Sequence, residues 1–223
     1  MKHWFAIAMA ALLSLAIGPS AFAQSPSCSG MTPGQLTSLN GFVPFPADDL
    51  WNTDVSNADV DPNSDNIINY IGANVTLHPD FGSGDYDHHS IGIPYQVVAG
   101  TQAKVNVKFT AYGDESDPGP MPIPSTALIE GYPRPGDGDR HVLVLDKDGC
   151  WLYELFHSYR RGALLWDADS SAIWDMTIDA ERPYTWTSAD AAGLPIFVGL
   201  ARYDEVAAGA INHALRFTLP STL

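Results

Sequence analysis

The chain has 223 residues, of which 45% are hydrophobic and 17% charged, and its formal net charge is −15 at pH 7. This length and apolar content fit one domain with a substantial core. The excess of acidic residues repels phosphate backbones and anionic lipids, which argues against nucleic acid or an anionic membrane as partner. Divalent cations and neutral ligands are compatible with such a charge.

The first 23 residues have the parts of a secretory signal peptide. Lys2 supplies a positive start, residues 4–17 are apolar, and Ala21-Phe22-Ala23 is an A-x-A cleavage signal. The apolar stretch is too short to span a bilayer comfortably, and the sequence contains no second long apolar run. We therefore expect a secreted or periplasmic protein with no membrane span.

Short predicted elements follow the signal peptide. Residues 24–41 are rich in Ser, Pro and Gly and are expected to form a flexible lead-in to a single β-rich domain over residues 42–223. The spacing of isoleucines predicts a short helix over residues 63–71. Residues 93–98 and 104–109 are predicted strands, and the second alternates apolar and polar side chains, as in a sheet with one wet face.

A proline-rich loop divides these strands from the second half of the domain. Residues 112–139 contain six prolines, a density that excludes helix and central strand. Such a loop is often functional, and the alternative is a rigid wrap over the core. After a hairpin, two helical turns over residues 187–193 and 202–208 and a strand over residues 211–219 complete the chain. Many short strands with few short helices predict an all-β fold, a β-sandwich or jelly roll.

The hairpin is predicted from residues 141–146 and 150–157, with Gly149 in the left-handed turn position. A loop of residues 147–149 sets one register, in which direct and diagonal neighbours lie about 5–8 Å apart. Four side chains then share one face at the end away from the turn: Asp139, His141, Tyr153 and His157. A loop of residues 147–148 instead places His141 opposite Glu154.

These hairpin residues are the main candidates for chemistry. His141 and His157 are expected to act as metal ligands or bases, and Asp139 as their orienting partner, because imidazole and carboxylate bind metals and move protons near neutral pH. Glu154 lies on an apolar strand, where burial raises a carboxyl pKa and suits a general acid. The structural alternative has both histidines satisfying buried hydrogen bonds and Glu154 paired with an arginine.

A second polar cluster lies between a glycine-bearing loop and a strand. If this segment is extended, Asp87 and His89 point one way and form a plausible metal-ligand pair. Tyr86 and His88 point the other way and form an acid–base pair of the kind that polysaccharide lyases use. A plain polar loop is the alternative. A dense acidic run further on suggests either a calcium site or a solvated loop: Asp114, Glu115 and Asp117.

Cysteines and absent motifs restrict the remaining possibilities. Cys28 and Cys150 are the only cysteines, and an exported chain with an even count favours a disulfide over two free thiols. Closing a loop of about 120 residues contributes about 4–5 kcal/mol in the chain-entropy model. H-E-x-x-H, G-x-S-x-G and P-loop motifs are absent from the sequence, so we expect no nucleotide cofactor and at most a divalent metal, Zn or Ca.

Six stretches together resemble a family of exported bacterial proteins. They are PFPADDLWN (44–52), IGIPY (91–95), DRHVLVLD (139–146), CWLYELF (150–156), ADAAGLPI (189–196) and HALRFT (213–218). The resemblance covers most of residues 42–220 and implies export, but it carries no activity or catalytic residue to this chain. It also implies that family members continue past the position of Leu223, so the domain is expected to be truncated at its C-terminus.

The combined features predict a secreted carbohydrate-active enzyme, either a glycoside hydrolase or a polysaccharide lyase, with possible metal assistance. Six tryptophans and nine tyrosines offer faces for sugar stacking, and carboxylate pairs cleave glycosidic bonds. The expected partner is a polysaccharide or another small extracellular ligand. The alternatives are a non-catalytic carbohydrate-binding or adhesion module with a structural metal, and a structural envelope protein without a ligand.

Overall fold

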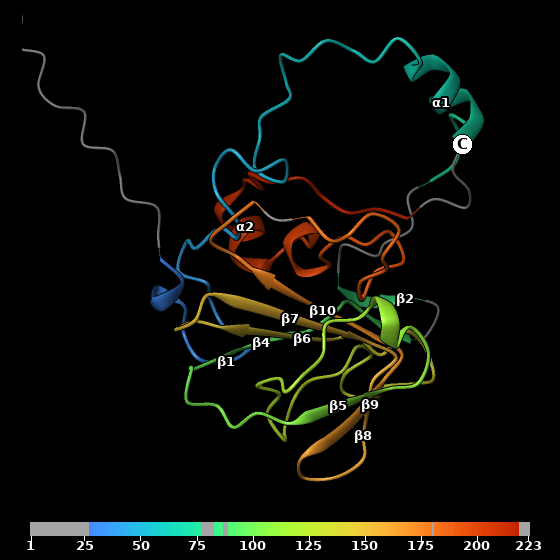
Figure 1. Ribbon diagram of the computed structural model, residues 1–223. Helices are drawn as coiled ribbons and strands as arrows, with labels where there is room; N and C mark the ends of the chain where they lie inside the picture. The colour runs from blue at the N-terminus through green and yellow to red at the C-terminus, as the bar shows by residue number, and fades with distance from the viewer. Residues whose placement is uncertain (1–26, 77–82, 87–88, 180, 219–223) are drawn as a thin grey trace, which may run out of the picture.

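The computed structural model describes residues 27–76, 83–86, 89–179 and 181–218 (Figure 1). The strands are β1 (Gly34–Gln35), β2 (Gly84–Tyr86), β3 (His89–Ile91), β4 (Tyr95–Val98), β5 (Asn106–Phe109), β6 (Val142–Asp146), β7 (Trp151–Phe156), β8 (Tyr159–Arg160), β9 (Leu165–Ala168) and β10 (Ser170–Asp175). The α-helices are α1 (Ser64–Ile71) and α2 (Tyr203–Ala208), and the 3-10 helices are η1 (Cys28–Gly30), η2 (Gly113–Glu115) and η3 (Phe197–Gly199).

The strands form one large sheet and two small ones. The five-stranded sheet has the order β1-β4-β6-β7-β10, the three-stranded sheet has the order β5-β9-β8, and β2 pairs with β3. Pairs β4–β6 and β5–β9 are parallel, and the others are antiparallel. The prediction of a β-rich fold with few short helices is confirmed. The jelly roll is not confirmed, because jelly rolls are antiparallel and these open sheets contain parallel pairs.

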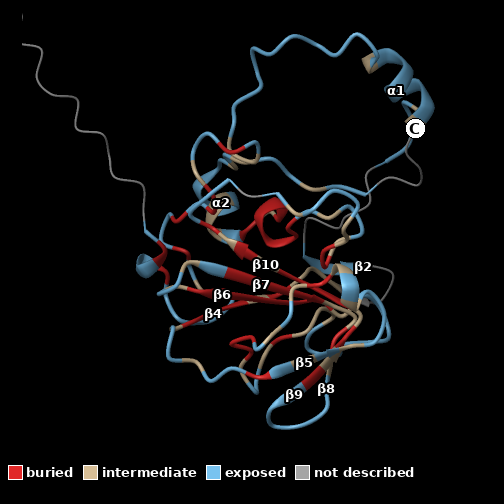
Figure 2. Cartoon of the chain, viewed as in Figure 1, coloured by how far each residue is buried: buried red, intermediate tan, exposed pale blue. Residues whose placement is uncertain are grey.

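Both faces of the five-stranded sheet are buried. Side chains alternate along each strand, so successive residues pack into two separate cores. On one face the core includes Leu143, Leu145 and Leu152, packed with the segment around η3. On the other face, Val144 and Leu155 pack with residues of the three-stranded sheet and the proline-rich loop. The fully enclosed residues among those that the two partners contribute include Trp166, Ala168, Met121 and Ile123. In Figure 2 the buried colour accordingly follows the central strands and η3.

The proline-rich loop covers the core, as in the structural alternative for this segment. Met121 and Ile123 are almost fully buried, and Met121 forms an isolated bridge with Val105. The expected lead-in also contributes to the core, since Met31 and Leu39 are buried. The predicted disulfide is confirmed, with 5.4 Å between the Cα atoms of Cys28 and Cys150, so the start of the described chain is joined to the β6–β7 turn.

The helices predicted over residues 63–71 and 202–208 are confirmed as α1 and α2. α1 is followed by the C-cap Gly72 and α2 by the C-cap Gly209, where φ is 97° and 76°, values that favour glycine. No residue of α1 is buried, and Figure 1 shows it on an excursion away from the sheets. None of the described helices is long and apolar enough to cross a membrane.

Two predicted elements near the C-terminus are wrong. Described residues 211–218 form no strand, because their main chain bonds to segments outside the sheets, with Ala214 N donating to Trp51 O and Arg216 N to Gly199 O of η3. Residues 187–193 form turns instead of a helix. The Ser188 hydroxyl lies 2.6 Å from the carbonyl oxygen of Leu194 and 2.9 Å from that of Asp190, either of which can accept its hydrogen, and this bonding competes with helical hydrogen bonding.

The β6–β7 hairpin has a different register from either predicted one. Asp146 pairs with Trp151, so four residues form the loop. Cys150, and not Gly149, takes the left-handed conformation, with φ of 58°. Asp146 Oδ1 accepts hydrogen bonds from the amides of Asp148 and Gly149, both at 3.0 Å, which fixes the turn.

This register separates residues that were expected to lie together. Leu143 pairs with Glu154, and Val144 pairs with Tyr153. Tyr153 therefore packs in the core on the face of Val144, while His141, two positions before Leu143, has the parity of the opposite face. The prediction that Asp139, His141, Tyr153 and His157 share one face is wrong.

Candidate functional site

Glu154 is fully buried at the centre of β7. Its carboxylate accepts hydrogen bonds from the amides of Ile196 (3.0 Å) and Phe197 (2.8 Å) and from the indole of Trp174 (3.2 Å). Burial raises the pKa of Glu154, and these donors together with the charge of His141 oppose that increase. The predicted desolvation is therefore present, but its partners are main-chain amides and an indole instead of an arginine. The contacts attach η3 to the sheet.

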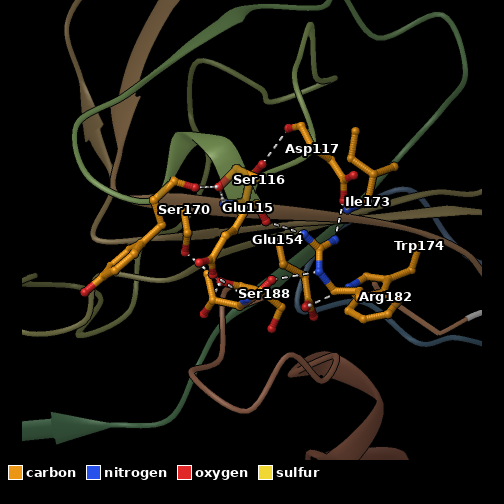
Figure 3. Close-up of polar contacts among 12 residues, drawn as sticks. Glu115, Ser116, Asp117, Glu154, Ser170, Ile173, Trp174, Arg182 and Ser188 are labelled. Atoms are coloured by element: carbon orange, nitrogen blue, oxygen red, sulfur yellow. Dashed lines mark hydrogen bonds and ion pairs between the residues drawn. The ribbon is translucent and has the colours of Figure 1, made fainter. Parts of the chain in front are cut away.

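The acidic residues of and after η2 also make contacts that hold the fold together, as Figure 3 shows. The buried Arg182 guanidinium donates to the Asp117 carboxylate, to the carbonyl of Glu115 at 2.7 Å and to the carbonyl of Thr187 at 2.8 Å. Asp117 also accepts from the amide of Ile173 at 2.9 Å. Glu115 and Asp117 therefore join the proline-rich loop to β10 and the following segment, in contrast to a solvated loop.

His141 is buried directly before β6, and both ring nitrogens face oxygen atoms. Nδ1 lies 2.6 Å from Glu130 Oε2, and Nε2 lies 3.0 Å from the carbonyl oxygen of Ala189. Burial acts to lower the pKa of His141, but the hydrogen bond and charge of Glu130 outweigh it and raise the pKa. Burial acts to raise the pKa of Glu130, and His141 in turn lowers it. A protonated imidazole donates to both oxygens.

Glu130, Asp139 and His141 can hold a metal ion, because one ligand atom from each lies within 4.8 Å of the other two. His157 is not in this group. Of the other predicted metal ligands, Asp87 lies outside the described residues. The predicted ligand His89 and the predicted acid–base residue Tyr86 are paired positions of β3 and β2, and only their main chain is described.

His157 lies where the chain passes from the five-stranded to the three-stranded sheet. It follows β7 and precedes β8, while Asp169 sits on the returning chain between β9 and β10. His157 Nδ1 is 2.9 Å from Asp169 Oδ2, and Nε2 is 3.1 Å from the hydroxyl of Tyr159. The side chains of His157 and Asp169 are 35% and 23% exposed. An Asp–His–Tyr chain therefore reaches solvent at this corner.

The backbone beside this chain is strained. His157 and Arg140 have φ of 50° and 51°, in the left-handed region that non-glycine residues seldom occupy. The amide of His157 donates to the carbonyl of Asp139 at 2.7 Å, and the amide of Ser158 donates to that of Arg140 at 3.3 Å. Such strain is maintained by surrounding contacts and is concentrated at functional sites.

Two arginines lie against the ring of Tyr159 in this otherwise acidic protein, and one of them, Arg161, is paired with Asp167. The Arg140 guanidinium carbon lies 4.2 Å from the centre of the Tyr159 ring, and that of Arg161 lies 5.3 Å away. Arg140 donates to the carbonyls of Ser158 and Gly136, and these bonds fix its position without neutralising its charge. We refer to Arg140, His157, Tyr159 and Asp169 as the Tyr159 site.

The structure thus divides the predicted hairpin residues between three places. Asp139 and His141 lie with Glu130, His157 belongs to the Tyr159 site, and Glu154 is enclosed in the core. The sequence analysis missed Glu130, Tyr159 and Asp169. Tyr159 had a usable signal, since residues two apart on an extended chain share a face, whereas Glu130 and Asp169 come close only through the tertiary fold. Comparison with protein-family models, curated proteins and solved structures found no match.

Proposed function

We propose that this protein is an extracellular polysaccharide lyase that acts on glycans bearing carboxylate groups. The observation that carries the proposal is the hydrogen-bonded chain from Asp169 through His157 to Tyr159, with Arg140 against the Tyr159 ring. Export is expected from the signal peptide. The disulfide between Cys28 and Cys150 is compatible with an oxidising extracellular compartment.

The order of hydrogen bonds defines the proton path. Asp169 accepts the Nδ1 hydrogen of His157, which leaves Nε2 to accept the hydrogen of the Tyr159 hydroxyl. Tyr159 can therefore give its own proton to His157 while its oxygen takes a proton from a substrate. Proton transfer by positioned side chains of this kind accelerates reactions by about 10²–10⁴-fold.

β-Elimination matches these groups. Arg140 pairs with the uronate carboxylate. This pairing makes the C–H on the carbon next to the carboxylate more acidic. Tyr159 Oη removes the proton from that carbon, and the Tyr159 proton passes to His157. The electron pair forms a carbon–carbon double bond as the bond to the glycosidic oxygen breaks. The leaving oxygen takes a proton from Tyr159, and His157 returns the proton that it holds.

A lyase is favoured over a hydrolase because the carboxylates near the Tyr159 site already have protein partners, and Glu154 is buried. Most glycoside hydrolases use two carboxyl groups that flank the scissile bond. Asp169 is hydrogen-bonded to His157, Asp167 accepts a hydrogen bond from Arg161 at 2.7 Å, and Glu154 is enclosed in the core. These described carboxylates are held by protein partners, whereas the Tyr159 hydroxyl lies on a half-buried residue at the surface.

The test is an ultraviolet assay for unsaturated uronate products on polygalacturonate, alginate and hyaluronan. We expect turnover on one of these polymers and a loss of at least about 100-fold in the Tyr159→Phe variant. Tyr132→Phe is the matched control, because Tyr132 is also a partly exposed tyrosine and lies outside the site. Polymer binding without product would favour the carbohydrate-binding module, and an undiminished rate in Tyr159→Phe would refute the role of Tyr159.

A further inference from the structure

The group formed by Glu130, Asp139 and His141 has features of a metal site beyond the closeness of its ligand atoms. The main chain fixes Glu130 and His141 relative to each other, since the amide of Glu130 donates to the carbonyl of His141 at 2.9 Å. Asp139 and His141 stand on either side of Arg140, directly before β6. The buried imidazole thus comes from the residue directly before the central strand β6, and both carboxylates come from the proline-rich loop.

The second ring nitrogen of His141 supplies an independent observation. Nε2 lies 3.0 Å from the carbonyl oxygen of Ala189, which can only accept a hydrogen bond, so Nε2 carries the hydrogen. Metal-binding histidines nearly always donate their other ring N–H to a carbonyl or carboxylate, which fixes the orientation of the ring. His141 therefore has its outer partner in place, and Nδ1 faces Glu130.

We propose that Glu130, Asp139 and His141 bind one Zn²⁺ ion through two carboxylates and His141 Nδ1. Imidazole favours Zn²⁺ over Ca²⁺ and Mg²⁺, which take oxygen ligands. With metal–ligand distances of about 2.0–2.2 Å, the present 2.6 Å between Nδ1 and Glu130 Oε2 must widen. The ion then replaces the proton that these atoms share. Asp139 is exposed, so its side chain can turn to the ion and the remaining position faces water.

Such an ion would connect three parts of the fold. It would join Glu130 of the proline-rich loop to the start of β6, and through Ala189 it would support the turn before η3. Asp139 also accepts the main-chain hydrogen bond of His157. Zinc would therefore fix the segment directly before β6, and this segment carries the main-chain bond to His157 of the Tyr159 site. The proposed zinc site does not depend on the proposed lyase activity.

The test is a calorimetric titration of the exported, disulfide-bonded protein with ZnCl₂ after chelator treatment. We expect one equivalent of Zn²⁺ to bind with micromolar or tighter affinity, with an accompanying rise in the melting temperature. Asp139→Asn and Glu130→Gln should each weaken the affinity by about tenfold or more. Asp137→Asn is the matched control, because Asp137 is an exposed aspartate of the same loop outside the group.

Three outcomes decide the matter. Loss of the single binding event in Asp139→Asn, with the Asp137→Asn affinity unchanged, supports the site. Unchanged affinity in both Asp139→Asn and Glu130→Gln refutes it, since zinc then binds elsewhere. Absence of saturable binding at micromolar Zn²⁺ also refutes it. Asp139 is exposed, so its variant should keep the wild-type circular dichroism spectrum even if Glu130→Gln is less stable.

Discussion

Substitution of Glu154 distinguishes a structural carboxylate from a general acid. Three buried N–H groups depend on it, from Ile196, Phe197 and Trp174. Each buried donor left without a partner costs about 1–3 kcal/mol. Glu154→Ala should therefore lower the free energy of unfolding by about 3–9 kcal/mol, a large part of the roughly 5–15 kcal/mol of a typical domain.

Glu154→Gln is the more informative variant because it preserves the side-chain volume. Its amide oxygen can still accept hydrogen bonds, but its NH₂ group faces N–H donors. We expect a loss of about 1–3 kcal/mol, measured by urea denaturation followed by circular dichroism. Glu181→Gln, at an exposed position, is the control and should stay within about 0.5 kcal/mol of wild type.

The result that would refute this reasoning combines stability with activity. If Glu154→Gln unfolds with the wild-type free energy while turnover of a polysaccharide falls by about 100-fold or more, Glu154 is a general acid. If stability falls and the specific activity of the folded fraction is retained, Glu154 is an anchor for η3. The enclosed geometry predicts the second result.

Two further predictions concern stability. Replacing Cys28 and Cys150 with serine should lower the free energy of unfolding by about 4–5 kcal/mol, given their separation of 122 residues; equal urea midpoints for the variant and the oxidised wild type would contradict this. Burial acts to raise the pKa of Glu205, but hydrogen bonds and charges from His213 and Arg202 lower it below 4.5. Because the folded pKa is the lower one, this stabilisation is present above the unfolded value and is lost as pH falls through the folded value. Urea denaturation from about pH 6 to about pH 3 should show a smaller loss in Glu205→Gln, and identical pH profiles would rule the contribution out.

The candidate site was only partly accessible from the sequence. His141, His157 and Asp139 were recognised because their side-chain chemistry is distinctive whatever the fold. Their partners were not, because Glu130 approaches His141 and Asp169 approaches His157 across turns and sheet crossings. The donors around Glu154 were missed for a similar reason, since a carboxylate on an apolar strand gives no indication of which N–H groups surround it.

The sequence by itself determined the features that depend on local chain chemistry. Isoleucine spacing and Gly72 defined α1, Gly209 ended α2, and two cysteines allowed a single pairing. Tertiary structure decided the rest. The Asp146 carboxylate and the disulfide at Cys150 set a four-residue turn, and that turn fixed the register that places His141 and Tyr153 on opposite faces. One residue of register reverses the face of every side chain in a strand, so the position of the site depended on long-range contacts that local patterns do not encode.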